Sequence, residues 1–223
     1  KDFVVVSFAL FSMFFGAGNV IFPPFLGTIS GDNFLSSGIG FMITGVGLPI
    51  LGVVAISKSQ NFENFSNKVF KNFHIILGSL IMIAIGPLLA IPKTAALTYE
   101  IGVTSLIPKA NMYISVAIFF LVTLYFSFNS GNVIDRLGAV LTPLLIISLA
   151  TLIIKGVIFP IGTPSFVENA ADFPRGFEEG YQTMDALASV LFAGTMLNSL
   201  KRKGYQGNDV TNMASMTGVL AGI

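Results

Sequence analysis

Long uncharged, apolar runs separated by short charged segments are the main feature of this sequence. A membrane helix needs about 20 residues at a rise of about 1.5 Å each, and several runs reach that length. The expected spans are residues 3–30, 33–57, 73–99, 111–129, 138–158, 178–199 and an incomplete 209–223. The pattern therefore predicts an all-α fold: a polytopic membrane helix bundle that forms a single transmembrane domain over residues 1–223.

The composition favours the same class. Hydrophobic residues make up 53% of the 223 and charged residues only 10%, with a mean hydropathy of +0.82. A soluble domain carries about 25% charged residues, so most of this surface is expected to face a lipid bilayer. The net charge of +1 gives no indication of a nucleic-acid partner. The lack of cysteine and the single histidine, His74, argue against disulfides, a histidine or thiolate metal site and a catalytic triad.

Lysine and arginine placement sets the expected orientation, because these residues favour the cytoplasmic side of a membrane. With the N-terminus inside, the inner segments hold Lys1, Lys58, Lys68, Lys71, Arg136, Lys201, Arg202 and Lys203, whereas the outer segments hold Lys109, Lys155 and Arg175. The bias predicts a multi-pass protein of the cell membrane with a cytoplasmic N-terminus. Residues 155–179 contain three prolines and are expected to form a long irregular outer loop.

The stretch Phe14-Phe-Gly-Ala-Gly-Asn-Val-Ile-Phe-Pro-Pro24 interrupts the first span. Relative to alanine, glycine costs about 1 kcal/mol and proline about 3 kcal/mol inside a helix. One interpretation is a proline-kinked helix with packing glycines. The other is a break at a polar cavity, with a half-helix ending near Phe15 and another starting near Asn19 or Val20. Free carbonyls at the first end would suit Na⁺ or an ammonium group, and free N–H groups at the second would suit a carboxylate.

The sixth span carries a carboxylate, Asp185, in the stretch Gly180-Tyr-Gln-Thr-Met-Asp-Ala-Leu-Ala188. A charged residue within a span is either functional or, at the outer interface, a helix N-cap. Two interrupted segments at corresponding positions of two repeats indicate a transporter site at the membrane midplane. The spacing fits a five-helix repeat in which the sixth span restarts the pattern in the inverted orientation.

Two further patterns predict packing. Gly38, Gly45 and Gly52 are seven residues apart, so we expect them to form one close-packing face of the second span. Phe15 and Phe22 are candidates to line an apolar side-chain pocket. The sequence does not begin with methionine and ends in an apolar run too short to span a bilayer, so we expect a piece of a longer protein.

Three segments, Phe11–Pro24, Ile85–Ala95 and Gly176–Ala188, resemble the bacterial branched-chain amino acid:cation symporters, the transport system II carriers for leucine, isoleucine and valine. The resemblance covers essentially the whole chain. This family is similar to the wider amino acid–polyamine–cation superfamily, which implies a LeuT-like inverted-repeat architecture, here the first repeat plus the sixth helix and the start of the seventh. It also implies Na⁺-coupled or H⁺-coupled import by alternating access.

Position by position, the resemblance implies that the substrate is bound by Gly16, Ala17, Gly18, Asn19, Tyr181, Gln182, Thr183, Met184 and Asp185, and the coupling ion by Ala17, Asn19 and Thr183. It implies no catalytic residue, and no cofactor or metal beyond Na⁺ (or H⁺). One Na⁺ site of the family also uses the eighth helix. The expected partners are therefore the amino acid, the lipid bilayer and the C-terminal remainder of the same carrier.

Three alternatives stay open. A channel would show rings of carbonyl or charged groups along a pore, and the sequence has no filter-like loop. A membrane-embedded enzyme would have to rely on carboxylates that are scattered over the predicted topology. The third alternative is a fragment that does not transport by itself.

Overall fold

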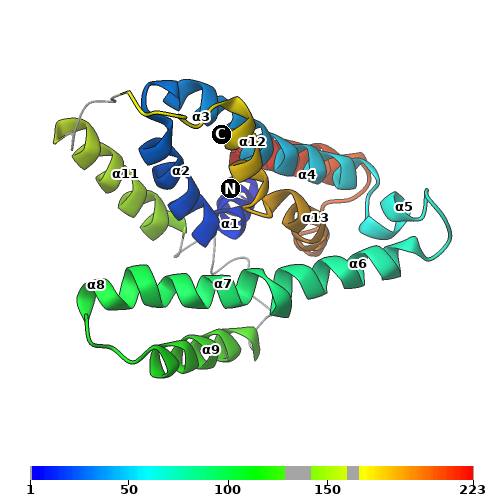
Figure 1. Ribbon diagram of the computed structural model, residues 1–223. Helices are drawn as coiled ribbons and strands as arrows, with labels where there is room; N and C mark the ends of the chain where they lie inside the picture. Colours follow the sequence, from blue (N-terminus) through cyan, green and yellow to red (C-terminus); the bar gives the residue numbers. More distant parts are fainter. Residues whose placement is uncertain (1, 129–141, 160–165, 223) are drawn as a thin grey trace. The chain divides into compact units, whose positions relative to one another are not determined.

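The computed structural model describes residues 2–128, 142–159 and 166–222, which contain helices and no β-strand (Figure 1). The chain divides into two compact units. The larger unit comprises Lys1–His74 and Ile134–Ile223, and the smaller unit comprises Ile75–Val133. The all-α prediction is confirmed for the described residues. The last residue of the predicted span 111–129 and the first residues of the predicted span 138–158 lie outside them.

The first part of the larger unit is a helical run that reverses once. Its elements are α1 (Asp2–Phe14), α2 (Ala17–Ser30), a 3₁₀ turn (Gly31–Asn33), α3 (Phe34–Met42), a π-helical turn (Ile43–Gly47), α4 (Leu48–Lys58) and α5 (Phe62–Ser66). The reversal occurs at Gly31, whose φ of 47° is unfavourable for any residue with a Cβ. The hydroxyls of Ser30 and Ser37 lie 2.7 Å apart and join α2 to α3 across this turn.

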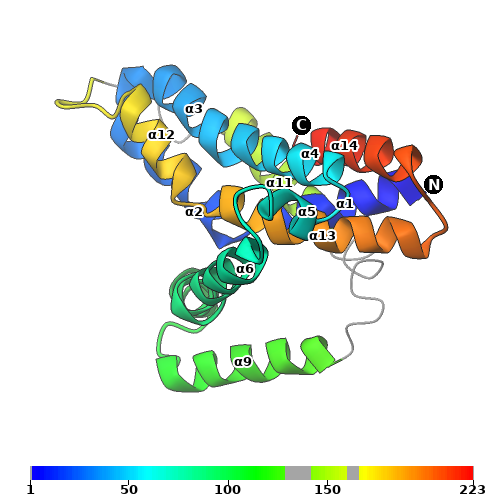
Figure 2. The same ribbon diagram turned by 90° about the vertical axis from the view of Figure 1, so that its right-hand side faces the viewer.

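The second part of the larger unit contains α11 (Thr142–Ile158), α12 (Phe173–Tyr181), α13 (Asp185–Arg202) and α14 (Asn208–Gly222). α12 lies along α3, and α14 lies along α4 (Figure 2). The predicted irregular outer loop over 155–179 is partly wrong, because α11 continues to Ile158 and α12 begins at Phe173. Pro174 is in the first turn of α12, where a missing N–H costs nothing, so the proline starts a helix there.

Small residues let α12 approach the second span closely. Gly176 and Gly180 are four residues apart on α12, and a Cβ at either one would overlap atoms of Ser37, Phe41 or Thr44. The Thr44 hydroxyl donates a 2.8 Å hydrogen bond to the carbonyl oxygen of Phe177 across this contact. The pair has the small-xxx-small spacing by which membrane helices pack without a hydrophobic driving force.

A second pair with the same spacing, Gly218 and Gly222 on α14, packs against Val53 and Ile50 of α4. The predicted glycine face of the second span is confirmed in part. Gly52 meets Ser189 of α13, and Gly45 lies near the backbone of Gly180, but a Cβ at Gly38 would meet nothing within 4 Å among the described residues. The π-helical turn at Ile43–Gly47 changes the register, so Gly40 rather than Gly38 contacts α12.

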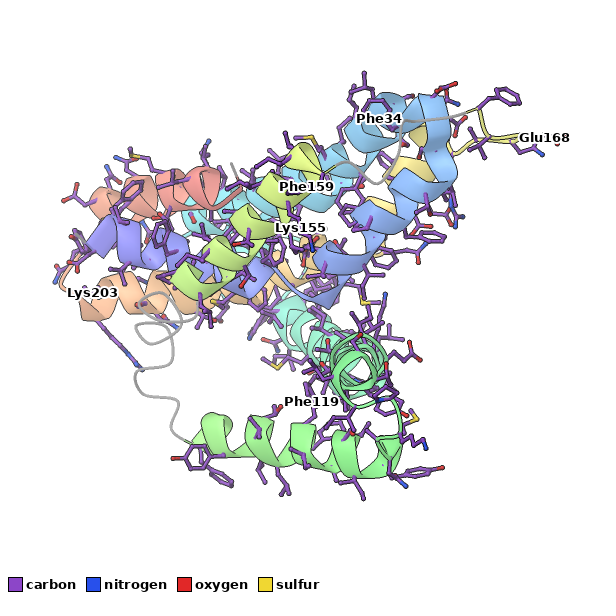
Figure 3. The ribbon with its side chains drawn as sticks, turned by 90° about the vertical axis from the view of Figure 1, so that its left-hand side faces the viewer. Phe34, Phe119, Lys155, Phe159, Glu168 and Lys203 are labelled. Atoms are coloured by element: carbon purple, nitrogen blue, oxygen red, sulfur yellow. The ribbon has the colours of Figure 1, made fainter. Side chains whose placement is uncertain are left out.

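The apolar core of the larger unit is formed by α1, α4, α13 and α14. Its buried members are Val6, Leu10, Val53, Ile56, Ala193, Met196, Leu197, Leu200, Val210, Ala214 and Ala221. At one end of the unit, Lys203 Nζ, just after α13, lies 3.6 Å from Asp2 Oδ1 at the start of α1. Phe34, at the start of α3, lies at the opposite end (Figure 3). The α1–α2 pair and the α12–α13 pair therefore run in opposite directions between these ends.

The smaller unit is a hairpin of two long apolar segments. The first contains α6 (Phe73–Ile83, shared with the larger unit), a π-helical turn (Ala84–Leu88), α7 (Ala90–Leu97), a second π-helical turn (Thr98–Val103) and α8 (Thr104–Leu106), and the second segment is α9 (Met112–Phe128). Gly86, just before Pro87, leaves helical geometry at φ −73° and ψ −108°. The proline removes a helical N–H and so accounts for this kink.

Two helical stretches, Gly18–Lys58 and Phe73–Leu106, are apolar and long enough to cross a membrane. Many large apolar side chains on the surface are exposed, among them Leu80, Leu121 and Ile153. Exposed apolar area on this scale is typical of a surface that contacts lipid rather than water.

Candidate functional site: two helix breaks beside a cavity

The first span is broken between α1 and α2. α1 ends at Phe14 and α2 begins at Ala17, so only Phe15 and Gly16 are outside helix. Gly16 is extended (φ −94°, ψ −175°) and, as the N-cap of α2, has no side chain with which to cap it. The predicted break is confirmed. The second half-helix was predicted to start near Asn19 or Val20, which is wrong by two to three residues, because α2 begins at Ala17.

The side chain of Asn19 bridges the break between the two half-helices. Its amide nitrogen donates a 2.7 Å hydrogen bond to the carbonyl oxygen of Phe14 at the end of α1. The same nitrogen donates a 2.8 Å hydrogen bond to Oδ2 of Asp185. The amide thus replaces a backbone donor across the break and also joins the first broken span to the second.

The sixth span is broken at residues 182–184, between α12 and α13. Met184 adopts a left-handed backbone conformation (φ 65°), which ends the continuity of the helix. The Thr183 hydroxyl donates to the carbonyl oxygen of Gly180 at 2.9 Å and accepts from the Asp185 N–H at 3.4 Å. Asp185 is the first residue of α13 and Met184 is its N-cap, so Asp185 is not the helix cap that one interpretation predicted.

The Asp185 carboxylate is buried. Asp185 is 7% exposed, and the ion pairs among the described residues join Arg175 to Glu178, Arg175 to Glu179 and Lys203 to Asp2. None of these includes Asp185. Its position in the first turn of α13 places the carboxylate at the positive end of that helix, which partly offsets its charge.

A cavity of about 220 Å³ opens beside the two breaks. It is lined by Phe11, Phe14, Phe15, Asn19, Pro23, Phe41, Gly45, Val46, Pro49, Ile50, Asp185, Ala221 and Gly222. Asn19 and Asp185 are the lining residues with polar side chains, and they lie next to each other. One water occupies about 30 Å³ in the liquid, so the cavity matches a small organic molecule with one polar end.

The structure brings some of the predicted site residues together. Asn19 and Asp185 both line the cavity, and Gly16 forms the first break. A Cβ on Gly18 would lie 3.4 Å from the Cα of Thr183, so glycine allows the two broken spans to approach here. Ala17 begins α2, and its side chain lies outside the described part of the chain.

The other predicted residues are next to the cavity in sequence but do not line it. Tyr181 is 54% exposed, Gln182 is also exposed, and Thr183 and Met184 are half-buried in the second break. Phe15 lines the cavity as predicted, whereas Phe22 packs beside the cluster of Leu26, Phe41 and Ala171.

Most residues of the cavity wall carry no signal in the sequence that marks them as part of a site. Phe11 and Phe14 share one face of α1 by their three-residue spacing, and Phe15 follows directly after that helix. Val46 and Ile50, four residues apart, share a face of the second span. Such spacing predicts a face, but nothing in the sequence selects the face that borders the cavity. Within the described residues, no group of three or more histidine, cysteine, aspartate or glutamate side chains is placed to hold a metal ion.

Comparisons with known proteins point to one family. A family model described as "Branched-chain amino acid transport protein" matches residues 1–223. Proteins named "Putative branched-chain amino acid carrier protein" are 41% identical in Staphylococcus haemolyticus, 40% in Staphylococcus saprophyticus and 39% in Staphylococcus epidermidis. Each alignment covers 100% of this chain but only 52–53% of the relative, so the chain spans about half the length of these proteins. No solved structure matches the chain.

Proposed function

Because the chain belongs to the family of branched-chain amino acid transport proteins, we propose that it forms part of a secondary active transporter that imports leucine, isoleucine or valine. The family is one of transport proteins, which implies a membrane protein and a non-enzymatic role. The observation that carries the proposal is the meeting of two helix breaks at Asn19 and Asp185 beside an apolar cavity. Interrupted helices with free ends are the usual site of binding in such carriers.

The cavity wall supports a branched aliphatic substrate. Phe15, Phe41, Val46 and Ile50 provide apolar contacts, and the first turn of α2 provides N–H groups without a capping side chain. An amino acid would place its carboxylate at these N–H groups and its side chain against the apolar wall. We expect Gly16, Ala17, Gly18 and Asn19 to surround the polar end, with residues Tyr181–Asp185 on the facing side.

A LeuT-like inverted repeat is the architecture we propose for the whole carrier. Its support is the opposite direction of the α1–α2 and α12–α13 pairs, each broken near its middle. With 13 residues in α1, the first break lies about 20 Å from the start of that helix, close to the centre of a bilayer whose hydrocarbon is about 30 Å thick. We further propose a multi-pass protein of the cell membrane with a cytoplasmic N-terminus.

Coupling to Na⁺ (or H⁺) completes the proposal. Ala17, Asn19 and Thr183 remain our candidates for the ion site, because they flank the two breaks and offer backbone, amide and hydroxyl oxygens. Alternating access would then move the larger unit's broken helices around a fixed site. The family site also uses an eighth helix, so the C-terminal remainder of the carrier is the partner that would complete it.

The half-length match supports a second candidate: this chain alone is a non-transporting fragment of a larger carrier. Uptake of labelled leucine into vesicles separates the two candidates. The full-length protein is expected to accumulate leucine under an inward Na⁺ or H⁺ gradient, and the 223-residue chain is the comparison. Ohmic single-channel currents, or no accumulation by the full-length protein under either gradient, would contradict the transporter proposal.

A further inference from the structure

The Asp185 carboxylate is a buried negative charge for which the described residues provide no basic partner. It is 7% exposed and borders the cavity, and its side-chain hydrogen bond to Asn19 is to a neutral amide. A charge in this position is costly unless a cation or a proton compensates it. A positive group on the cavity side of Asp185 would provide this compensation.

The cavity selects among the cations that could provide this charge. A bare monovalent ion needs a shell of oxygen ligands, as hard cations do in general. Of the described lining residues, Asn19 and Asp185 alone carry side-chain oxygens, and the other side chains of the lining are apolar. A space of about 220 Å³ with one acidic end and an apolar wall instead fits a cation that carries a hydrocarbon group.

We propose that Asp185 binds the α-ammonium group of the transported amino acid. The inference rests on the proposed function and assigns one chemical group of the substrate to one side chain. The ammonium group would lie at Asp185 and the carboxylate at the first turn of α2, which is held beside Asp185 by the Asn19 hydrogen bond. The side chain would then extend toward Phe41 and Ile50.

Asn19 has a defined part in this arrangement. Its amide donates to both Phe14 and Asp185, so it holds the carboxylate at a fixed distance from the end of α1. Pro23, which also lines the cavity, has no N–H to donate to the carbonyl of Asn19. In the proposed arrangement this carbonyl would be a second acceptor for an ammonium group, which has three hydrogens to donate.

The test uses the full-length carrier in proteoliposomes at saturating Na⁺. Unlabelled leucine, 3-methylbutylamine (which lacks the carboxylate) and 4-methylpentanoate (which lacks the ammonium group) compete with labelled leucine. In the unmodified protein, we expect 3-methylbutylamine to compete measurably and 4-methylpentanoate not to compete. Equal competition by 4-methylpentanoate and leucine would overturn the inference without any variant.

The variants are D185N and D185E, with D209N as the matched control, because Asp209 is also in the first turn of a helix but is exposed. We expect D185N to weaken leucine binding roughly 10- to 100-fold, the effect of losing one charge-assisted hydrogen bond. D185N should also reduce the discrimination against 4-methylpentanoate, and D185E should restore part of it. D209N should leave both properties unchanged.

Two results would overturn the assignment while leaving the proposed function intact. One is leucine affinity unchanged in a folded D185N. The other is a shift, in D185N, of the Na⁺ concentration needed for leucine uptake, with unchanged discrimination between leucine and 4-methylpentanoate. That result would assign the carboxylate to the coupling ion. Failure of the unmodified full-length protein to accumulate leucine would instead reject the proposed function itself.

Discussion

The amide nitrogen of Asn19 lies 2.8 Å from Oδ2 of Asp185, although 166 positions separate the two residues in sequence. This contact joins the first turn of α2 to the first residue of α13. Each helix contributes its positive end to the same point, because each begins there after a break. The polar side chains of the cavity are thus held by helix ends rather than by loops.

Asn19→Ala removes both hydrogen bonds of the amide. Because the lost bonds include one to a buried carboxylate, we expect leucine affinity to fall roughly 10- to 100-fold. Competition uptake in proteoliposomes measures the effect. Asn198→Ala, an exposed position on α13, is the control and should transport normally. Full affinity in Asn19→Ala would show that this contact has no part in binding.

Gly18→Leu should abolish leucine binding while leaving membrane insertion unchanged. A Cβ at Gly18 would already lie 3.3 Å from the Phe22 ring and 3.4 Å from the Cα of Thr183, and backbone cannot move aside as a side chain can. Gly27→Leu, on the same helix, is the control, since a Cβ there meets no described atom within 4 Å. Binding of labelled leucine to purified protein checks the result, and normal binding by Gly18→Leu would contradict it.

Ile50→Ala should change the choice of substrate. Ile50 lines the apolar wall, so truncation enlarges the cavity and removes contacts to a leucine side chain. We expect the affinity ratio of leucine to phenylalanine to fall roughly tenfold, the scale of one or two methylene groups in an apolar pocket. Leu51→Ala is the control, because Leu51 is 64% exposed. An unchanged ratio would mean that the substrate side chain lies elsewhere.

Gly180→Ala should lower the thermal stability of the protein. The added methyl group would overlap the Thr44 hydroxyl and the Phe41 carbonyl, forcing α12 away from the second span and stretching the Thr44–Phe177 hydrogen bond. Overpacking of this kind costs about 1–3 kcal/mol. Circular dichroism during heating in detergent measures the shift. Gly194→Ala, where a Cβ meets no described atom within 4 Å, should be neutral or slightly stabilising, and equal stability of both variants would argue against close packing at Gly180.

The sequence by itself determined the class of the protein and the place of its interruptions. Charge-free runs give all-helical segments because a bilayer leaves no other way to satisfy the backbone. The glycines near residue 16 and the carboxylate at Asp185 mark the two breaks because both residue types are costly inside an apolar helix.

Only the tertiary structure decided which residues meet. Helical spacing could identify a face containing Phe11 and Phe14, but all faces of an apolar helix look alike when both lipid and neighbouring helices are apolar. The contact between Asn19 and Asp185, and the choice of Gly40 over Gly38 at α12, depend on how distant helices pack and on one π-helical turn. Those arrangements are set by close packing between segments far apart in the chain, which no local pattern encodes.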